Sequence, residues 1–138
     1  GQIIIERDYD PSIPELEADK GQLIQALLNI CRNAMQAMVE AQPPVEQPTL
    51  QLRTRTVRQF TIGHHRHRLV AQIDITDNGP GIASALRENL FYPMVSGRAE
   101  GTGLGLSISQ SIINQKNGII EFTSDPGKTT FSIYLPLE

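Results

Sequence analysis

The apolar residues of this chain recur with two different spacings along the sequence. Between residues 19 and 41 they return at intervals of three and four, which places them on one face of an α-helix. Asp19 and Gln22 suit a capping box at the start of this helix, and Pro43-Pro44 suits its end. We therefore predict a helix over residues 19–41. Its apolar face comprises Leu23, Leu27, Ile30, Ala34, Ala37, Met38 and Ala41.

Elsewhere the sequence shows the alternation and β-branched composition of strands, separated by turn-forming residues. A short helical stretch is predicted at 84–90 and a second long helix at 104–116, with Gly118 after its last turn. The order β-α-β-β-loop-α-β-β predicts an α/β fold in which helices cover one face of a sheet. The predicted strands are residues 2–7, 49–62, 68–76, 119–123 and 129–135, with turns at 63–67 and 125–127.

Composition narrows the class of protein. The 138 residues suit a single domain, and no apolar run approaches the ~20 residues of a membrane span. Cys31 is the only cysteine, which rules out an internal disulfide and favours a cytoplasmic location. A net charge of −3, no tryptophan and 5% aromatic residues are a poor basis for nucleic-acid binding. We expect a cytoplasmic, single-domain protein that binds neither membranes nor nucleic acids.

Positive charge is concentrated in one segment. Residues 51–70 hold five arginines and no acidic residue, a local charge of +5 that leaves −8 for the rest of the chain. Such a segment is usually a solvated face, and a binding surface for a regulatory protein is the alternative. His64, His65 and His67 lie at the predicted turn of this segment, without a convincing third metal ligand. The arginines are Arg53, Arg55, Arg58, Arg66 and Arg68.

Two asparagines lie at the edge of the apolar face of the first predicted helix. Asn29 and Asn33 are four residues apart, so they stack one turn above the other. Their amide oxygens are neutral, hard ligands that suit a magnesium ion which also takes phosphate oxygens and waters. The alternative is that both amides only border the core.

A carboxylate is predicted on the buried face of a strand. Ala71, Ile73 and Ile75 share one face, and the same alternation places Asp77 on it. A buried carboxylate must be hydrogen-bonded, and the exocyclic amine of a purine is a suitable donor. Gly79 and Gly81 would let the base lie against the backbone. The alternative is an ordinary turn, for which such a cluster is typical.

A third cluster, Gly101-Thr102-Gly103-Leu104-Gly105-Leu106-Ser107, opens the second long helix. Backbone amides at such a helix start can bind phosphates, supported by the helix dipole. The cluster is not a P-loop, because no Gly-Lys-Ser/Thr follows. It is not a Rossmann fingerprint either, because a loop precedes it and Leu106 stands where the last glycine should be.

Taken together, these three clusters resemble the ATP-binding domain shared by gyrases, Hsp90-type chaperones, histidine kinases and MutL. Phe91-x-Pro93 and the Leu-Gly-Leu-Ser of residues 104–107 indicate the histidine kinases in particular. Residues 91–98 and 126–136 are most similar to the nitrogen-regulation sensor kinases of two-component systems. The resemblance covers residues 1–138 as one catalytic ATP-binding domain. It implies the Bergerat-type fold, a two-layer sandwich of a mixed β-sheet with helices on one face.

The resemblance also implies roles around a bound Mg-ATP. Asn33 matches the magnesium-binding asparagine, and Asn29 is its companion in catalysis one turn earlier. Asp77 matches the aspartate that binds adenine, with Gly79 and Gly81 beneath the base. The phosphate side corresponds to Gly101, Thr102, Gly103, Leu104 and Gly105.

Residues 92–102 would form the lid over the nucleotide in such a domain. Arg98 within this lid is a candidate for contact with the γ-phosphate, and a solvated loop arginine is the alternative. Thr129 matches a threonine near the adenine pocket. The chain departs from the family at Met94, where a second aromatic is usual, and at Gly127-Lys128-Thr129, where Gly-x-Gly-Thr is commoner.

The residue at position 29 separates two activities. Relatives that hydrolyse ATP commonly carry a glutamate there to activate water, whereas Asn29 cannot accept a proton at neutral pH. Phosphoryl transfer depends mainly on positioning and charge neutralisation, so a domain without this base can still act as a donor. The expected activity is transfer of the γ-phosphoryl group of ATP to a histidine. An ATPase or conformational clamp of the gyrase-Hsp90 type and a serine kinase of a regulatory partner are the alternatives.

The acceptor histidine is expected on a separate dimerisation domain, outside this chain. His64, His65 and His67 lack the helical, acidic context of the phospho-accepting histidine in this family. The resemblance adds a response regulator as the downstream partner and the PII protein as a candidate regulator.

Overall fold

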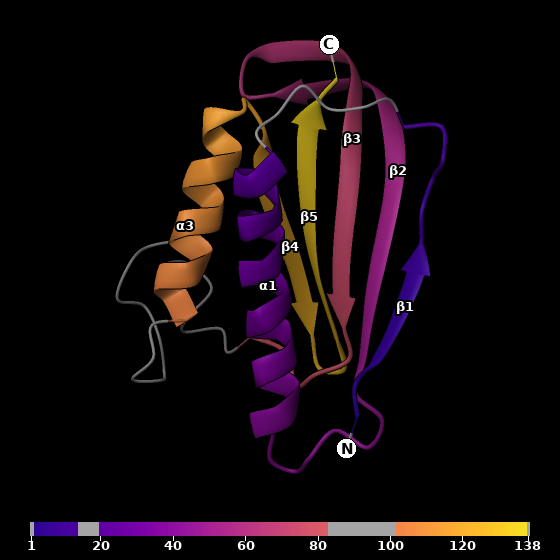
Figure 1. The fold of residues 1–138 in the computed structure, drawn as a ribbon, viewed down its shortest axis with the longest axis vertical. Helices are drawn as coiled ribbons and strands as arrows, with labels where there is room; N and C mark the ends of the chain where they lie inside the picture. The colour runs from indigo at the N-terminus through magenta and orange to yellow at the C-terminus, as the bar shows by residue number, and fades with distance from the viewer. Residues whose placement is uncertain (1, 14–19, 83–101, 138) are drawn as a thin grey trace.

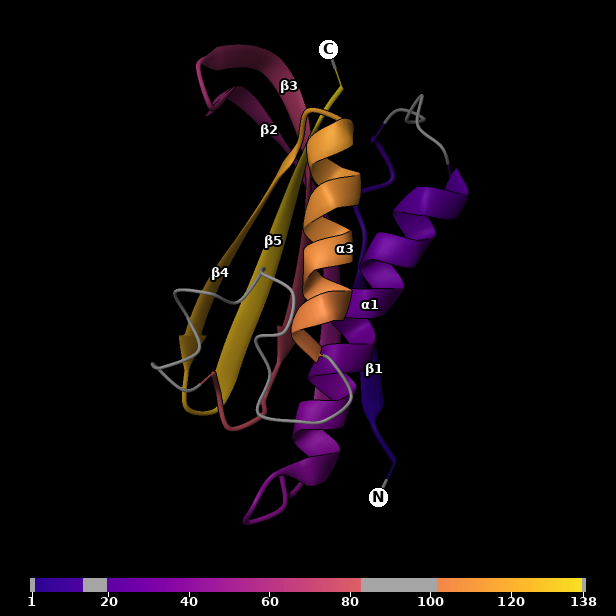
Figure 2. The ribbon, with the colours of Figure 1, turned by 90° about the vertical axis from the view of Figure 1, so that its left-hand side faces the viewer.

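The computed structural model describes residues 2–13, 20–82 and 102–137, and these residues form two layers. A five-stranded sheet is covered on one face by two helices, which pack side by side (Figures 1 and 2). This confirms the predicted α/β architecture. The elements are β1 (Ile4–Asp8), α1 (Lys20–Glu40), β2 (Thr49–Ile62), β3 (His65–Asp77), α3 (Thr102–Gln115), β4 (Ile119–Asp125) and β5 (Lys128–Pro136).

The sheet is mixed, as predicted. Its strand order is β1-β2-β3-β5-β4, so β3 is the central strand and the last two strands are exchanged relative to their order in the sequence. The edge strand β1 pairs with β2 in parallel, and the three other pairs are antiparallel. The order inserts β5 between β3 and β4, and this places Thr129 of β5 directly opposite Asp77.

Each helix packs on the sheet through a stripe of apolar side chains along one of its faces. In α1 the fully buried positions recur every four residues, at Ala26, Ile30, Ala34 and Met38, and they pack on a core with Leu50, Ile75 and Ile133. Helix α3 lies beside α1, and the buried hydroxyl of Ser109 in α3 donates a hydrogen bond of 2.8 Å to the carbonyl of Ala26. Small side chains at this contact let the two helices approach closely.

Several element boundaries differ from the predictions by one to three residues, including β1 at Ile4–Asp8 and the end of β4 at Asp125, and two of the differences affect the functional argument. Strand β3 starts at His65, not at residue 68, so the connection between β2 and β3 is only Gly63-His64, with Gly63 at φ +61°. The hairpin is exposed there, so its pairing needs no alternation of apolar residues. Helix α3 begins at Thr102, two residues early, which puts Gly103 and Gly105 in its first turn. The predicted helical stretch at 84–90 and the cap at Asp19 lie outside the described residues.

Within the described residues, no helix is both long and apolar enough to cross a membrane.

Candidate functional site

Three buried polar side chains lie in a row across the sheet, at the end where β3 and β4 finish and β5 begins (Figure 1). Thr129 pairs with Asp77 of β3 on one side and with Ser124 of β4 on the other. Residues directly opposite each other on antiparallel strands point to the same face, and Leu50, the other partner of Asp77, is in the core. The row therefore lies on the face that the helices cover. In the described part of the chain, the one further buried polar residue is Ser109.

Asp77 is on the buried face of β3, as the alternation predicted, with 6% of its surface exposed. Its Oδ1 accepts a hydrogen bond of 2.9 Å from the backbone N–H of Gly79, and Oδ2 has no donor among the described residues. Burial raises the pKa of this carboxyl, and the Gly79 hydrogen bond opposes the shift only in part. An open acceptor in a desolvated position suits an amino group of a ligand.

Ser124 is a site residue that the sequence analysis missed. Its hydroxyl lies 2.8 Å from the hydroxyl of Thr129 and accepts a 2.8 Å hydrogen bond from the backbone N–H of Ile82. It thereby ties the loop after Asp77 to the neighbouring strand. The signal was present, because Ile120, Phe122 and Ser124 alternate on one face of β4, just as apolar residues lead to Asp77 in β3.

The loop after Asp77 is closely packed at both of its predicted glycines. A Cβ on Gly79 would lie 3.0 Å from Asp77 Oδ1 and 3.2 Å from Met38 Cγ of α1. Gly81 has φ +93°, and a Cβ there would lie 3.1 Å from the carbonyl oxygen of Asp125. The carbonyl of Gly79 also accepts a 2.9 Å hydrogen bond from the N–H of Gly127. Both glycines are thus required by the close approach of α1 and the β4–β5 turn.

Asn78 in the same loop has a structural role. Its Oδ1 accepts a 2.9 Å hydrogen bond from the N–H of Thr49, and its Nδ2 donates one of 2.8 Å to the carbonyl of Gln47. The side chain therefore fixes the start of β2, while the neighbouring Asp77 carboxylate is left to the site.

Asn29 and Asn33 both lie on α1, half-buried beside its buried stripe. Met38, which contacts Gly79, is five residues beyond Asn33, a rise of about 7.5 Å along the helix. Among the described residues no group of three or more His, Cys, Asp or Glu could hold a metal ion. The Asn33 side chain offers a neutral amide oxygen, a donor type that suits a magnesium ion which also takes phosphate oxygens.

The glycine cluster forms the start of α3, beside the middle of α1 (Figure 1). The first turn of a helix has backbone N–H groups without partners inside the helix, and Thr102, Gly103, Leu104 and Gly105 supply them here. This is the arrangement that binds phosphate groups. Residues 92–101 of the predicted lid, which include Arg98 and Gly101, lie outside the described residues.

The remaining predicted features lie away from this end. His64, His65 and His67 are in the β2–β3 hairpin at the opposite end of β3 (Figure 1). Cys31 is half-buried on α1, and burial raises the pKa of its thiol, as expected of a thiol packed against the core.

The sequence model of the histidine kinase-, DNA gyrase B- and HSP90-like ATPase family matches residues 18–138. The chain is 59% identical over 131 residues to the sensory histidine kinase/phosphatase NtrB of Klebsiella oxytoca, and 57% identical to NtrB of Escherichia coli O157:H7. Each alignment covers 95% of this chain and 36% of the relative, so the chain spans about a third of their length.

Solved structures share the fold. The catalytic domain of the histidine kinase ThkA superposes with a TM-score of 0.73 at 24% identity, over 97% of this chain and 78% of that one. The Acinetobacter baumannii histidine kinase AdeS gives 0.67 at 23% identity, over 99% of this chain and 55% of that one. With the family match over nearly the whole length, the chain belongs to the histidine kinase-, DNA gyrase B- and HSP90-like ATPase family.

Proposed function

We propose that this chain is the cytoplasmic catalytic domain, residues 1–138, of a sensor histidine kinase of nitrogen regulation. It binds Mg-ATP and donates the γ-phosphoryl group to a histidine on a separate dimerisation domain. The family is one of ATPases, and the relatives at 59% and 57% identity are named sensory histidine kinase/phosphatase NtrB. The observation that carries the proposal is Asp77, a buried carboxylate whose Oδ2 is left open beside a loop of two close-packed glycines.

The base-binding side of the site is built around Asp77. Its Oδ2 accepts a hydrogen bond from the exocyclic amine of adenine, while Gly79 donates to Oδ1 and holds the carboxyl in place. Gly79 and Gly81 would lie beneath the base, in a loop that packs closely against Met38 and Asp125. Thr129 lies opposite Asp77 in the register, with its hydroxyl held by Ser124.

The phosphate-binding side is built on the two helices. Backbone N–H groups of Gly101, Thr102, Gly103, Leu104 and Gly105 bind the phosphates, and Arg98 neutralises charge on the γ-phosphate. The amide oxygen of Asn33 holds the magnesium ion, which supplies charge neutralisation for the transferred group. Asn29, one turn before Asn33, positions the reacting groups without acting as a base.

The acceptor must come from elsewhere. His65 begins β3 and Asp77 ends it, so the hairpin histidines are about 40 Å of strand away from the base-binding side. Within one molecule this length of strand separates the hairpin histidines from the base-binding side, which supports a histidine on a partner domain. A response regulator then receives the phosphoryl group. The resemblance to nitrogen-regulation kinases also makes a PII-type signalling protein the regulator that we would test first.

A labelling experiment with γ-labelled ATP tests this function. The chain alone, a separate dimerisation domain alone and the mixture are compared, with Asp77→Asn chain as the control. We expect label only in the mixture, on the histidine of the added domain, and none with the control. Transfer is slow because no linker raises the local concentration. Label on the chain itself, or fast phosphate release without acceptor, would reject the donor domain in favour of an ATPase.

The metal assignment has its own test. We expect Asn33→Ala to weaken ADP binding much more with magnesium present than in EDTA, because the lost ligand acts only through the metal. Calorimetry under the two conditions measures this difference. Equal losses would show instead that the Asn33 amide only borders the core.

A further inference from the structure

The β2–β3 hairpin extends beyond the sheet. Strand β1 flanks β2 only as far as Arg53, and β5 flanks β3 only from Val70 onward. Residues 54–69, which we call the projecting hairpin, therefore pair only within β2 and β3 and have no further strand along their outer edges. They extend past the helices and bend toward the open face of the sheet (Figures 1 and 2). A two-stranded hairpin is only marginally stable alone in water, so other contacts must hold it in place.

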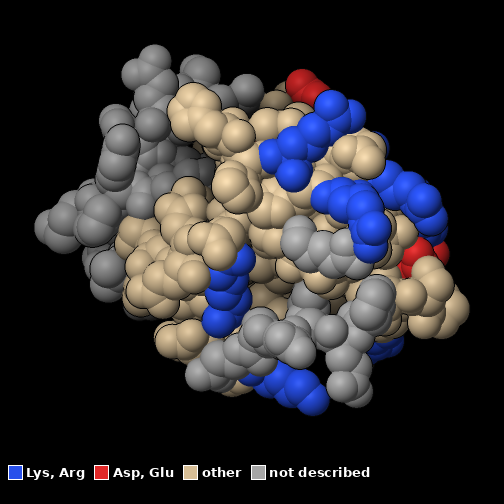
Figure 3. Space-filling view, turned by 90° about the horizontal axis from the view of Figure 1, so that it is seen from above, with Lys and Arg blue, Asp and Glu red and all other residues tan. Residues whose placement is uncertain are grey.

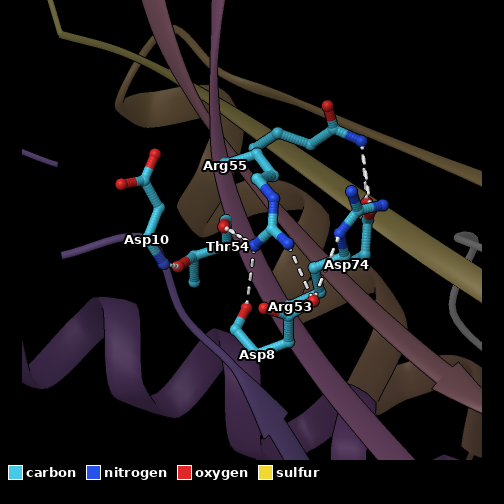
Figure 4. Close-up of polar contacts among 7 residues, drawn as sticks. Asp8, Asp10, Arg53, Thr54, Arg55 and Asp74 are labelled. Atoms are coloured by element: carbon cyan, nitrogen blue, oxygen red, sulfur yellow. Dashed lines mark hydrogen bonds and ion pairs between the residues drawn. The ribbon is translucent and has the colours of Figure 1, made fainter. Parts of the chain in front are cut away.

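Specific contacts fix this hairpin to the body of the domain. The ring of Phe60 stacks on Tyr134 of β5, with 4.3 Å between centroids and 14° between planes. At the base of the hairpin, the guanidinium of Arg55 lies 2.7 Å from the side-chain carboxylate of Asp8 in β1. It also donates a 3.1 Å hydrogen bond to the backbone carbonyl of Asp8 (Figure 4). Thr54 Oγ1 accepts a 2.9 Å hydrogen bond from the N–H of Asp10. The hairpin is thus held in one shape before any partner binds, which lowers the entropy cost of association.

The hairpin carries arginines beyond those that this anchoring uses. Arg53 and Arg55 share the carboxylate of Asp8, whereas Arg58 and Arg66 lie further out and are exposed. Figure 3 looks onto this end of the molecule, where Lys and Arg side chains are spread across the surface and acidic ones show only at its margins. Residues 51–70, which include the hairpin, hold a charge of +5 while the rest of the chain holds −8, so positive charge is concentrated at this end of the molecule.

We propose that the projecting hairpin docks an acidic surface of a partner protein. Arginine forms paired hydrogen bonds with carboxylates and is enriched in protein interfaces, and this segment has arginines with no lysine. A nucleic acid fits less well, because the chain as a whole is negative at −3. A bilayer fits less well too: in the described chain, every exposed large apolar side chain lies outside residues 54–69.

Such a partner would leave the nucleotide site open, because the hairpin and Asp77 are at opposite ends of β3. The proposal is therefore independent of the proposed kinase function. If one proposal fails, the other is unaffected, because docking is measured by NMR shift changes in the hairpin and kinase activity by transfer of the label from ATP.

An NMR titration of the chain tests the proposal, with a polyglutamate peptide as the acidic probe. We expect shift changes confined to the amides of residues 54–69. The double variant Arg58→Glu/Arg66→Glu should raise the dissociation constant about tenfold, because opposed charges become like charges. Arg32→Glu on α1 makes the same kind of change on an exposed arginine elsewhere and should leave the peptide affinity within twofold. All variants should bind ADP equally.

Three results would overturn the proposal. The first is a set of shift changes outside the hairpin. The second is an equal loss of affinity in Arg32→Glu, which would indicate a general charge effect. The third is tighter binding to a DNA duplex or to phosphatidylserine vesicles than to the peptide, measured under the same salt conditions.

Discussion

The two ends of β3 show how differently one strand can be used. At the Asp77 end the strand is flanked on both sides and covered by α1, and its polar groups are buried and hydrogen-bonded. At the His65 end it has one neighbour and carries exposed charge. The Asp77 end can recognise a ligand by the position of single atoms, whereas the hairpin can recognise only the charge and shape of a surface. Substitutions at the two ends should therefore fail in different ways.

Two glycines with positive φ give the largest contrast. At Gly81 an added Cβ would lie 3.1 Å from a backbone oxygen, whereas at Gly63 nothing lies within 4 Å. We expect Gly81→Ala to lower the free energy of unfolding by about 2–3 kcal/mol and Gly63→Ala by about 1 kcal/mol. Urea denaturation measures both values. Equal losses would mean that only backbone strain matters, and that the packing at Gly81 does not.

Asp77→Asn should weaken ADP binding by about 2 kcal/mol, because a charge-assisted hydrogen bond is lost. The same substitution should not lower the stability of the domain, although it lowers the affinity for ADP. Burial raises the pKa of Asp77, so the wild-type chain loses stability as pH rises through the folded-state pKa, and the amide avoids this loss. Thermal unfolding at pH 7 should show Asp77→Asn at least as stable as wild type.

Asp74→Asn is the matched control, on the half-buried open face of the same strand. It should leave ADP affinity unchanged. A similar loss of affinity in both variants, measured by calorimetry, would point to overall charge and remove the specific role of Asp77.

Ser124→Ala should cost about 1–2 kcal/mol of unfolding free energy, because the N–H of Ile82 and the hydroxyl of Thr129 lose their partner. ADP affinity should fall as well, since the loop after Asp77 is no longer tied to β4. Ser111→Ala on the exposed face of α3 is the control and should be close to neutral. Stability that falls with unchanged ADP affinity would limit Ser124 to a structural role.

Phe60→Leu should have the smallest global effect, since the ring stack on Tyr134 is worth about 1 kcal/mol. The change should be local: hydrogen exchange at the amides of residues 54–69 becomes faster, while the core strands keep their protection. Phe122→Leu, which disturbs a ring pair against the core, should instead lower the stability of the whole domain. Uniformly faster exchange in Phe60→Leu would show that the hairpin is part of the cooperative unit.

Local patterns were sufficient to predict much of this molecule. The period of α1 identified Ile30, Ala34 and Met38 of its buried stripe but missed Ala26, and continuing the alternation of β3 placed Asp77 on the buried face. The same reasoning applied to β4 would have found Ser124, which belongs to no motif and was passed over. Gly79 and Gly81 were predicted to lie beneath a base, and that contact stays a prediction, because the atoms that leave no room for a Cβ belong to the protein itself.

Other features depend on pairing between distant residues. Thr129 lies between Asp77 and Ser124 only because β5 inserts between β3 and β4, an order that no short stretch of sequence encodes. The hairpin was predicted with too long a turn, because residues exposed on both faces need no apolar alternation to pair. The roles of Asn29 and Asn33 remain predictions from family resemblance, and Gly101 and Arg98 lie outside the described residues.

The hydrogen bond from Ser109 to the carbonyl of Ala26 has a mechanical consequence. Sliding of one packed helix along another is a common way for domains to rearrange, and it requires a contact surface without fixed partners. Here a buried donor and acceptor 2.8 Å apart set the register between α1 and α3, and sliding would leave both unsatisfied. We therefore expect the two helices to move as one body, which keeps the Asn33 amide and the first turn of α3 at a constant separation throughout a catalytic cycle.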